Sequence, residues 1–490
     1  MTQSRERTVD MIIIGGGLSG LCAAIAAKQE GVEDLVVLEK NANPGGNAVF
    51  PDFMVAWDGS IPRMPCLDDN RITDGDPRID PDPQVRSDAI FRMTMDWNHW
   101  RGDARLIRTL VEETERVYPW IGAMMEPEDR FTDEPLKYRG NMRGRQLKML
   151  LRKCRELNVE IVRSTPAKKL LLDEDGRARG VLAEDAGGEI TFLARQVLIG
   201  TGGFMGDEEL MRRYLPTFDE TTMEDMCFMG AVYSGDGIKM AFEIGAADDG
   251  TVAFECDPNK TPWCRNAFTP CRDLLNNTSH PEYVWVSKLG ERFCDESKIN
   301  ATNSMYRLPH KACWILFDQG YLDHLLASSP FRPWAYPKGA EDFETRWQRQ
   351  FDKGYTKKAD TWEELAEFIG CPPETLRRTM DEYNADSLTG RDRWFGKSAD
   401  AMRPITDGPF YASFSPMPML VTRGPLRVDC SMRLLGRDYR PIPGFYAMGV
   451  DIGGTDSDTY ASCSPSHSSL FSAASARIAA RTAAKEILNG

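Results

Sequence analysis

The sequence lacks the features of a membrane protein or a secreted one. Its apolar runs, such as Met11 to Ile14, are far shorter than the roughly 20 residues that a membrane-spanning helix needs. The first residues, from Met1 to Val9, are mainly polar and charged, so we expect no secretory signal. The formal net charge is -14, and an acidic surface repels nucleic-acid phosphates and anionic lipids. We therefore predict a cytoplasmic protein with neither nucleic acid nor membrane as a partner.

Closely spaced metal ligands are also missing. The 12 cysteines include no C-x-x-C pair, and the five histidines show no ligand spacing. Iron–sulfur clusters, structural zinc and c-type haem usually need closely paired thiols. We therefore predict no metal site, and we interpret the cysteines as reduced and mostly buried thiols.

A glycine-rich loop lies between a predicted strand and a predicted helix near the N-terminus. Residues 8–14 are β-branched and apolar, as in a buried strand, and residues 15–20 follow as G-x-G-x-x-G. Residues 21–29 form an alanine-rich helix, and a second strand at residues 35–38 ends at Glu39. A purely structural glycine turn is the alternative, but the strand, helix, strand and acid all stand where a dinucleotide site needs them.

Each residue of this pattern has a physical role. Gly15 permits the tight turn, Gly17 lets the backbone approach a pyrophosphate, and Gly20 lets the helix pack on the strand. The helix N-terminus offers N–H groups and a positive dipole end to the phosphates. Glu39 can accept hydrogen bonds from ribose hydroxyls. The loop therefore predicts a dinucleotide-binding site.

The composition changes along the chain, whose 490 residues are many for a single core. After about residue 255, Trp, Pro, Asn and His become more frequent and regular periodicity weakens, until the earlier character returns near Pro409. We predict an α/β fold in which residues 1–255 and 401–490 form the nucleotide-binding domain. Residues 256–400 form an inserted α+β domain.

Five segments, in order along nearly the whole chain, resemble one known family. Gly45 and Gly46 form a second glycine pair behind Glu39, which suits a loop that runs along a flavin. The other segments are Gly200-Thr201-Gly202-Gly203-Phe204, Ser234-Gly235-Asp236-Gly237, Gly290-Glu291-Arg292-Phe293 and Pro443 to Gly449. Together they resemble the flavoproteins of fumarate reductase and succinate dehydrogenase, with features of the related 3-ketosteroid Δ1-dehydrogenases.

The resemblance implies a Rossmann-like FAD-binding domain of the glutathione reductase type, with the inserted domain capping the flavin and the substrate between them. It also implies non-covalent FAD, because the loop from Asn43 to Val49 lacks the histidine that carries a covalent flavin. The residues expected to bind FAD are Gly15, Gly17, Leu18, Ser19, Gly20, Glu39, Lys40, Gly45, Gly46, Asn47, Ala167, Thr201, Gly202, Gly203, Asp236, Gly449, Asp451, Ser464 and Ser466. The sequence has no second dinucleotide fingerprint, so the electron donor is NAD(P)H bound transiently, another protein or a second substrate.

Four positions depart from the family pattern. Asp257 and Val421 stand where the family has histidines, Asn300 replaces the arginine that supplies a proton, and Tyr460 replaces a carboxylate-clamping arginine. An ionised carboxylate without cationic partners is costly to desolvate. We therefore expect a small-molecule substrate other than fumarate, succinate or a close dicarboxylate.

Five residues are candidates for the catalytic site, each with a plainer alternative. Tyr460 resembles the tyrosine that ketosteroid dehydrogenases place over a substrate carbonyl, but it also suits a buried structural role. Asp257 is a candidate acid/base or substrate contact, or else a turn acid before proline, and Asn300 is a similar candidate. Arg423 is a candidate relocated cation or a surface ion pair. His467 precedes a predicted helix whose N–H groups would steady negative charge on a reduced flavin.

The resemblance and the departures together predict an FAD-dependent oxidoreductase. We expect hydride transfer between flavin N5 and a carbon of a neutral cyclic or aromatic substrate, with reduction of a C=C bond or an activated C–O centre. Plant phenolics and steroids are suitable substrates, and a tetrahydrodaidzein reductase, which completes equol formation, fits the loss of carboxylate clamps. The alternatives are a Δ1-ketosteroid dehydrogenase, an electron-transfer flavoprotein subunit and a non-catalytic flavin-fold carrier.

Arg292 and Glu296 are expected to form a structural pair.

Overall fold

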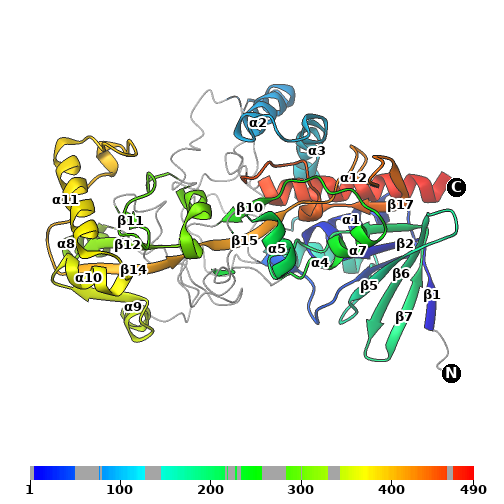
Figure 1. The fold of residues 1–490 in the computed structure, drawn as a ribbon. Helices are drawn as coiled ribbons and strands as arrows, with labels where there is room; N and C mark the ends of the chain where they lie inside the picture. Colours follow the sequence, from blue (N-terminus) through cyan, green and yellow to red (C-terminus); the bar gives the residue numbers. More distant parts are fainter. Residues whose placement is uncertain are drawn as a thin grey trace.

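The computed structural model places the elements in two groups at opposite ends of the molecule (Figure 1). One group contains β2 (Met11–Ile14) and the long helix α12 (His467–Asn489), and the other contains β12 (Ala312–Asp318). Strand β15 (Pro418–Arg423) lies between them. The structure describes residues 5–49, 77, 80–126, 145–215, 218, 227–228, 233–256, 283–298, 301–328, 343–460 and 467–489.

The first group is built on a central sheet of six strands. In spatial order these are β16 (Arg433–Leu435), β17 (Pro441–Ala447), β8 (Gln196–Ile199), β2, β3 (Leu35–Leu38) and β4 (Glu160–Val162). Strands β2, β3 and β8 run parallel and are buried along their whole length. Their apolar sequences fit this position, because a parallel sheet is covered on both faces. The predicted α/β fold is confirmed.

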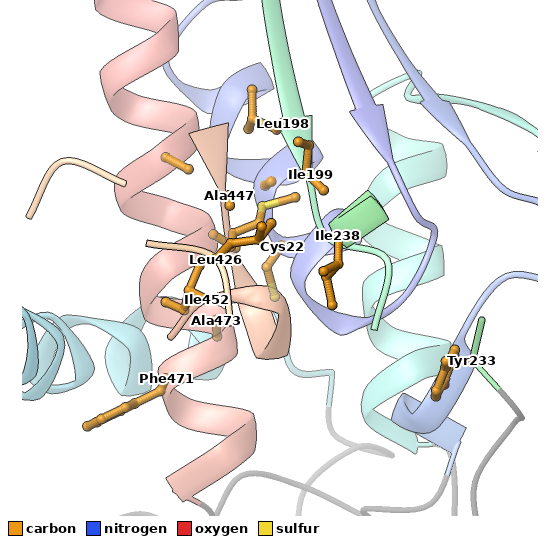
Figure 2. Close-up of a cluster of buried hydrophobic side chains, with 14 of the residues drawn as sticks. Cys22, Leu198, Ile199, Tyr233, Ile238, Leu426, Ala447, Ile452, Phe471 and Ala473 are labelled. Carbon is orange, nitrogen blue, oxygen red and sulfur yellow. The ribbon is translucent and has the colours of Figure 1, made fainter. Parts of the chain in front are cut away.

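Helix α1 (Leu18–Gln29) packs against α12 beside this sheet. Both helices are rich in buried alanine, which lets them approach closely. Figure 2 shows Cys22 of α1 surrounded by apolar side chains from β8, β17 and α12, among them Ile199, Ala447 and Ala473. Burial raises the pKa of the Cys22 thiol, so it remains protonated and behaves as a small apolar residue.

A second sheet and several helices complete this group. The sheet contains β1 (Arg5–Thr8), β7 (Gly188–Leu193), β6 (Ala178–Asp185) and β5 (Ala167–Leu172), in that order. The helices are α2 (Pro83–Trp97), α3 (Ala104–Gly122), α4 (Arg145–Glu156), α5 (Glu208–Tyr214) and α7 (Asp236–Glu243). Within the described part of the chain, no helix is both long and apolar enough to cross a membrane.

The second group has its own sheet and its own hydrophobic cluster. The sheet contains β11 (Val284–Val286), β12, β14 (Phe410–Pro416) and β13 (Thr356–Ala359), in that order. Its helices are α8 (Gln319–Ser328), α9 (Phe343–Asp352), α10 (Trp362–Ile369) and α11 (Pro373–Thr389). Strand β14 belongs to this sheet although it lies in the range 401–490 that we expected in the FAD-binding domain. The domain boundaries stay a prediction.

Two strands connect the groups. Strand β10 (Ala253–Cys256) precedes the second group in the sequence, and β15 follows it. They pair with each other in antiparallel fashion, and β9 (Cys227–Phe228) pairs with β15 on its other side. The chain therefore leaves and re-enters the first group along neighbouring strands.

The second group also contains a buried network of balanced charge. The Arg292 guanidinium donates to Glu296 at 2.7 Å and to Asp392 at 3.0 Å, and Lys397 donates to Glu296 at 3.2 Å. All four side chains are almost fully buried. The expected structural pair of Arg292 and Glu296 is confirmed, and it is part of a larger network.

Candidate functional site

A cavity of about 300 Å³ opens at the carboxyl ends of β2 and β3. The loop from Gly15 to Ser19 and the residues around Glu39 line one part of it. Other parts of the lining come from the 3₁₀ turn η1 (Gly46–Val49), the loop after β8, strand β15 and the start of α12. This position matches the rule that ligands bind at the carboxyl ends of parallel strands.

The three glycines of the first loop have different surroundings, and each fits its expected role. A Cβ on Gly15 would lie 2.3 Å from the Gly200 carbonyl oxygen, and one on Gly20 would lie 1.8 Å from that of Gly15. At Gly17 the nearest atom would be 3.9 Å away, so a side chain there would occupy the open cavity. Gly17 also precedes α1 without a side-chain cap. The N-terminal N–H groups of α1 and the open space beside Gly17 suit a pyrophosphate.

Glu39 is buried at the end of β3 and lines the cavity. Its carboxylate accepts a hydrogen bond from the Gly16 N–H at 2.9 Å and one from the Asn41 N–H at 2.8 Å. A carboxylate has about four lone-pair sites, so capacity remains for ribose hydroxyls. The geometry of Glu39 therefore fits the expected ribose contact.

Asp451 is also buried, but it acts on a loop rather than lining the cavity. It accepts hydrogen bonds from the N–H and hydroxyl of Thr201 at 2.5 and 2.8 Å, and from the N–H groups of Gly202 and Gly203 at 3.1 and 2.7 Å. Burial raises the pKa of Asp451 despite these donors. Asp451 thus ties η10 (Gly449–Asp451) to the loop after β8, whose Thr201 and Gly202 do line the cavity.

Tyr233 contributes to the cavity and was missed by the sequence reasoning. A Cβ on Gly46 would lie 2.8 Å from its hydroxyl, and one on Gly202 would lie 3.2 Å from its ring. Both glycines have positive φ, at 49° and 94°. The two glycine pairs are thus shaped partly by a tyrosine remote in sequence, which no local pattern around Tyr233 indicated.

Lys40 and Asp236, both expected to bind FAD, form an ion pair across the cavity wall. The Lys40 Nζ lies 3.0 Å from the Asp236 carboxylate and 2.9 Å from the Ser234 hydroxyl. Of the described residues that line the cavity, Lys40 is the only cation. Asn47 donates from its side-chain amide to the Leu420 carbonyl at 2.9 Å, which ties η1 to β15.

The structure brings most of the expected FAD residues to one place. Those that line the cavity are Gly15, Gly17, Leu18, Ser19, Glu39, Lys40, Gly46, Asn47, Ala167, Thr201, Gly202 and Asp236. Those that lie in the supporting loops and α1 are Gly20, Gly45, Gly203, Gly449 and Asp451. Four expected site residues, Asp257, Asn300, Ser464 and Ser466, lie outside the described residues.

A second, buried cluster joins three of the expected catalytic residues around Asp456. The Arg423 Nε donates to the Asp456 carboxylate at 2.7 Å, and its Nη2 donates to the Thr455 hydroxyl at 3.0 Å. The His467 Nε2 lies 3.2 Å from the other Asp456 oxygen, and the Tyr460 ring meets the His467 ring edge-on at 5.7 Å. Arg423 therefore forms a buried ion pair, and the alternative of a surface ion pair is wrong.

The cluster adjoins the cavity through Val421 and Ser468. Val421 lines the cavity and lies two positions before Arg423 on β15, so their side chains share one face of the strand. Ser468 lines the cavity beside His467, and its N–H donates to the Tyr460 hydroxyl at 3.2 Å. Burial lowers the pKa of His467 despite the nearby Asp456, so the imidazole is neutral at pH 7.

The sequence reasoning missed Asp456 as well as Tyr233. Asp456 lies 33 residues after Arg423, and only the folded chain brings their side chains together. Among the described residues, no group of three or more His, Cys, Asp or Glu side chains is arranged to hold a metal ion.

Comparisons with known proteins agree with this geometry. A family model described as an FAD binding domain matches residues 132–466, and one described as an NAD(P)-binding Rossmann-like domain matches residues 13–54. Vinyl phenol reductase from Lactiplantibacillus plantarum is 24% identical over 94% of this chain and 93% of its own. NADH:acrylate oxidoreductase from Vibrio harveyi is 26% identical over 92% of this chain, which spans only 48% of that relative.

One solved structure supports the fold. The 3-ketosteroid Δ1-dehydrogenase from Sterolibacterium denitrificans, in complex with 1,4-androstadiene-3,17-dione, has a TM-score of 0.74 and 18% identity. The match covers 98% of this chain and 100% of that one.

Proposed function

The chain belongs to the FAD-binding domain family, and we propose that this FAD-dependent oxidoreductase reduces a C=C bond, or an activated C–O centre, of a neutral cyclic or aromatic substrate. A phenol that carries a conjugated alkene fits best, because a vinyl phenol reductase matches along almost the whole of both chains. The wider class of proposed substrates includes steroids and isoflavonoids such as tetrahydrodaidzein. Electrons would come from NAD(P)H or from a protein donor, in the cytoplasm.

The proposed FAD site occupies the cavity. Gly17 and the N-terminus of α1 would hold the pyrophosphate, and Glu39 would accept hydrogen bonds from the ribose. The flavin ring would then lie towards Val421 and the start of α12. When bound, FAD supplies two-electron chemistry, with hydride passing between its N5 and a substrate carbon.

The proposal is supported mainly by the ion pairs that charged side chains form around the cavity. Lys40 is paired with Asp236, and Arg423, beyond Val421, is paired with Asp456. A carboxylate that entered from water would find both of these cations already paired with an acid, so the charge of each would compensate its desolvation only weakly. The lining near β15 includes the apolar side chains of Leu420, Val421 and Val450, which suit contact with a neutral ring.

Reduction of a C=C bond needs a proton as well as a hydride. We propose Tyr460 as its donor, because the Ser468 N–H fixes the position of the phenol oxygen next to the cavity. Asp257, Asn300, Arg423 and His467 stay candidates for substrate contacts or for support of Tyr460.

Half-reactions test the proposal. The purified holoenzyme is reduced by light without oxygen and then mixed with a vinyl phenol, an isoflavonoid, a steroid enone or fumarate, while flavin absorbance is followed. The proposal expects a neutral aromatic or cyclic compound to reoxidise the flavin much faster than fumarate does. Comparable reoxidation by fumarate would contradict it. If saturated compounds bleach the oxidised flavin and alkenes fail to reoxidise it, the enzyme is a desaturase.

A further inference from the structure

Asp456 is a buried acid that forms an ion pair with Arg423. Its side chain is 1% exposed and that of its partner Arg423 is 2% exposed. Arginine remains charged in proteins, and the neighbouring His467 is held neutral by burial. The described cluster therefore contains one positive and one negative charge, which cancel.

The positive charge of Arg423 would act on a ligand in the cavity if the negative charge of Asp456 were removed. It shares a strand face with Val421, which lines the cavity, whereas Thr422 points the other way and accepts from the Phe204 N–H at 2.9 Å. Within the described part of the chain, the Arg423 Nη1 has no hydrogen-bond acceptor. An arginine with an unfilled donor is well suited to bind a carboxylate.

We infer that Asp456 is a specificity-determining residue, which cancels the charge of Arg423 and so keeps the site selective for neutral substrates over anionic ones. The inference rests on the proposed function. Arg423 and Asp456 are buried, and charges act more strongly there than in water, so one carboxylate can decide which substrate binds. Asp456 need not touch the substrate for this effect.

The test uses two alkenes that differ in one charge. A vinyl phenol is neutral, and the corresponding hydroxycinnamate is the same alkene with a carboxylate. The measured quantity is the ratio of kcat/KM for hydroxycinnamate to kcat/KM for vinyl phenol, with a chemical electron donor. In Asp456→Asn the amide oxygen still accepts from the Arg423 Nε, but the negative charge is gone. We expect the ratio to rise by about tenfold or more, because an uncancelled buried positive charge attracts a carboxylate.

Two further variants distinguish an effect of the lost Asp456 charge from an effect of a changed site structure. Asp458→Asn removes an acid from the same loop, where Asp458 is exposed and paired with Arg101, and should leave the ratio unchanged. The double variant Arg423→Gln/Asp456→Asn removes both charges and leaves the pair neutral, as in the native enzyme. Its ratio should stay within about threefold of the native value, and it should fold even if the single variant, with its buried unpaired cation, does not.

The outcomes distinguish this inference from the proposed function. A native enzyme that prefers hydroxycinnamate would contradict the proposed function itself. A native enzyme that prefers vinyl phenol, with an unchanged ratio in Asp456→Asn, would overturn only the role of Asp456. A double variant whose ratio changes by tenfold would also overturn that role, because charge could not explain the change.

Discussion

At the end of the cavity near Glu39, polar groups keep capacity for a ligand, whereas at the end near Val421 the charges are matched within the protein. Glu39 accepts from Gly16 and Asn41 and can accept more, and the N-terminus of α1 has no side-chain cap. Near Val421, Arg423 is committed to Asp456. The first arrangement suits a ligand with phosphates and hydroxyls, and the second suits a neutral ring. One cavity can therefore hold a charged cofactor and still discriminate against a charged substrate.

The largest effect is expected from Tyr460→Phe, at the Val421 end. If Tyr460 supplies the proton, kcat should fall by about 100-fold or more, because general acids contribute on that scale. Uptake of electrons by the flavin should stay normal, since that step does not use the substrate proton. Steady-state and stopped-flow kinetics check both, with the exposed Tyr439→Phe as control. An unchanged kcat would show that Tyr460 is only structural.

A smaller effect is expected from Gly17→Ala, at the Glu39 end. The added Cβ meets no protein atom closer than 3.9 Å, but it occupies space that the pyrophosphate needs. The protein should fold, and the Kd for FAD should rise by about tenfold or more, equal to about 1.4 kcal/mol or more. Titration of the apoprotein with FAD measures this. Gly122→Ala, which also meets no atom, is the control. Native affinity in Gly17→Ala would refute the placement of the pyrophosphate.

Glu39→Gln tests FAD binding at the same end of the cavity by removing the carboxylate charge. The glutamine amide would face the N–H of Gly16 or Asn41 with a donor instead of an acceptor. We expect the Kd for FAD to rise by about fivefold to tenfold, since one or two hydrogen bonds are lost or weakened. Substrate selectivity of the FAD-saturated variant should not change. A changed selectivity would mean that the two ends are not independent.

The smallest effect concerns His467 and the pH dependence of stability. Burial lowers the pKa of this imidazole in the folded protein, despite the nearby Asp456, so the unfolded chain takes up a proton that the folded chain does not. The folded protein therefore loses stability relative to the unfolded chain as pH falls below the unfolded pKa of about 6.5.

His467→Gln should remove this part of the pH dependence, and unfolding in urea at pH 7 and pH 5.5 measures it. His324→Gln, at an exposed position on α8, is the control. An identical pH dependence in native protein and His467→Gln would show that the histidine is not buried as described.

The sequence predicted the Glu39 end well because that end is local. Strand, helix and strand follow each other within a short stretch and are observed as Met11–Ile14, Leu18–Gln29 and Leu35–Leu38. Two boundaries differ. The predicted strand began at Thr8, but that residue ends β1, which pairs with β7 of another sheet. The helix begins three residues earlier than expected, since Gly17 can stand before its first turn.

The Val421 end is assembled from distant segments, so the sequence indicated only part of it. Arg423, Tyr460 and His467 were candidates, but nothing local to Asp456 showed that it would join them. Tyr233 reaches Gly46 and Gly202 only through tertiary packing. Ion pairs and ring contacts between distant segments depend on the fold as a whole, which residue spacing alone does not describe.

The preference of the site for neutral over anionic substrates can be measured on the native enzyme. The measurement is the ratio of kcat/KM for a vinyl phenol to kcat/KM for fumarate, with one chemical electron donor and fixed ionic strength. We predict a ratio of about 100 or more, since a carboxylate that loses its water without a cationic partner costs several kcal/mol. A ratio near or below one would contradict it.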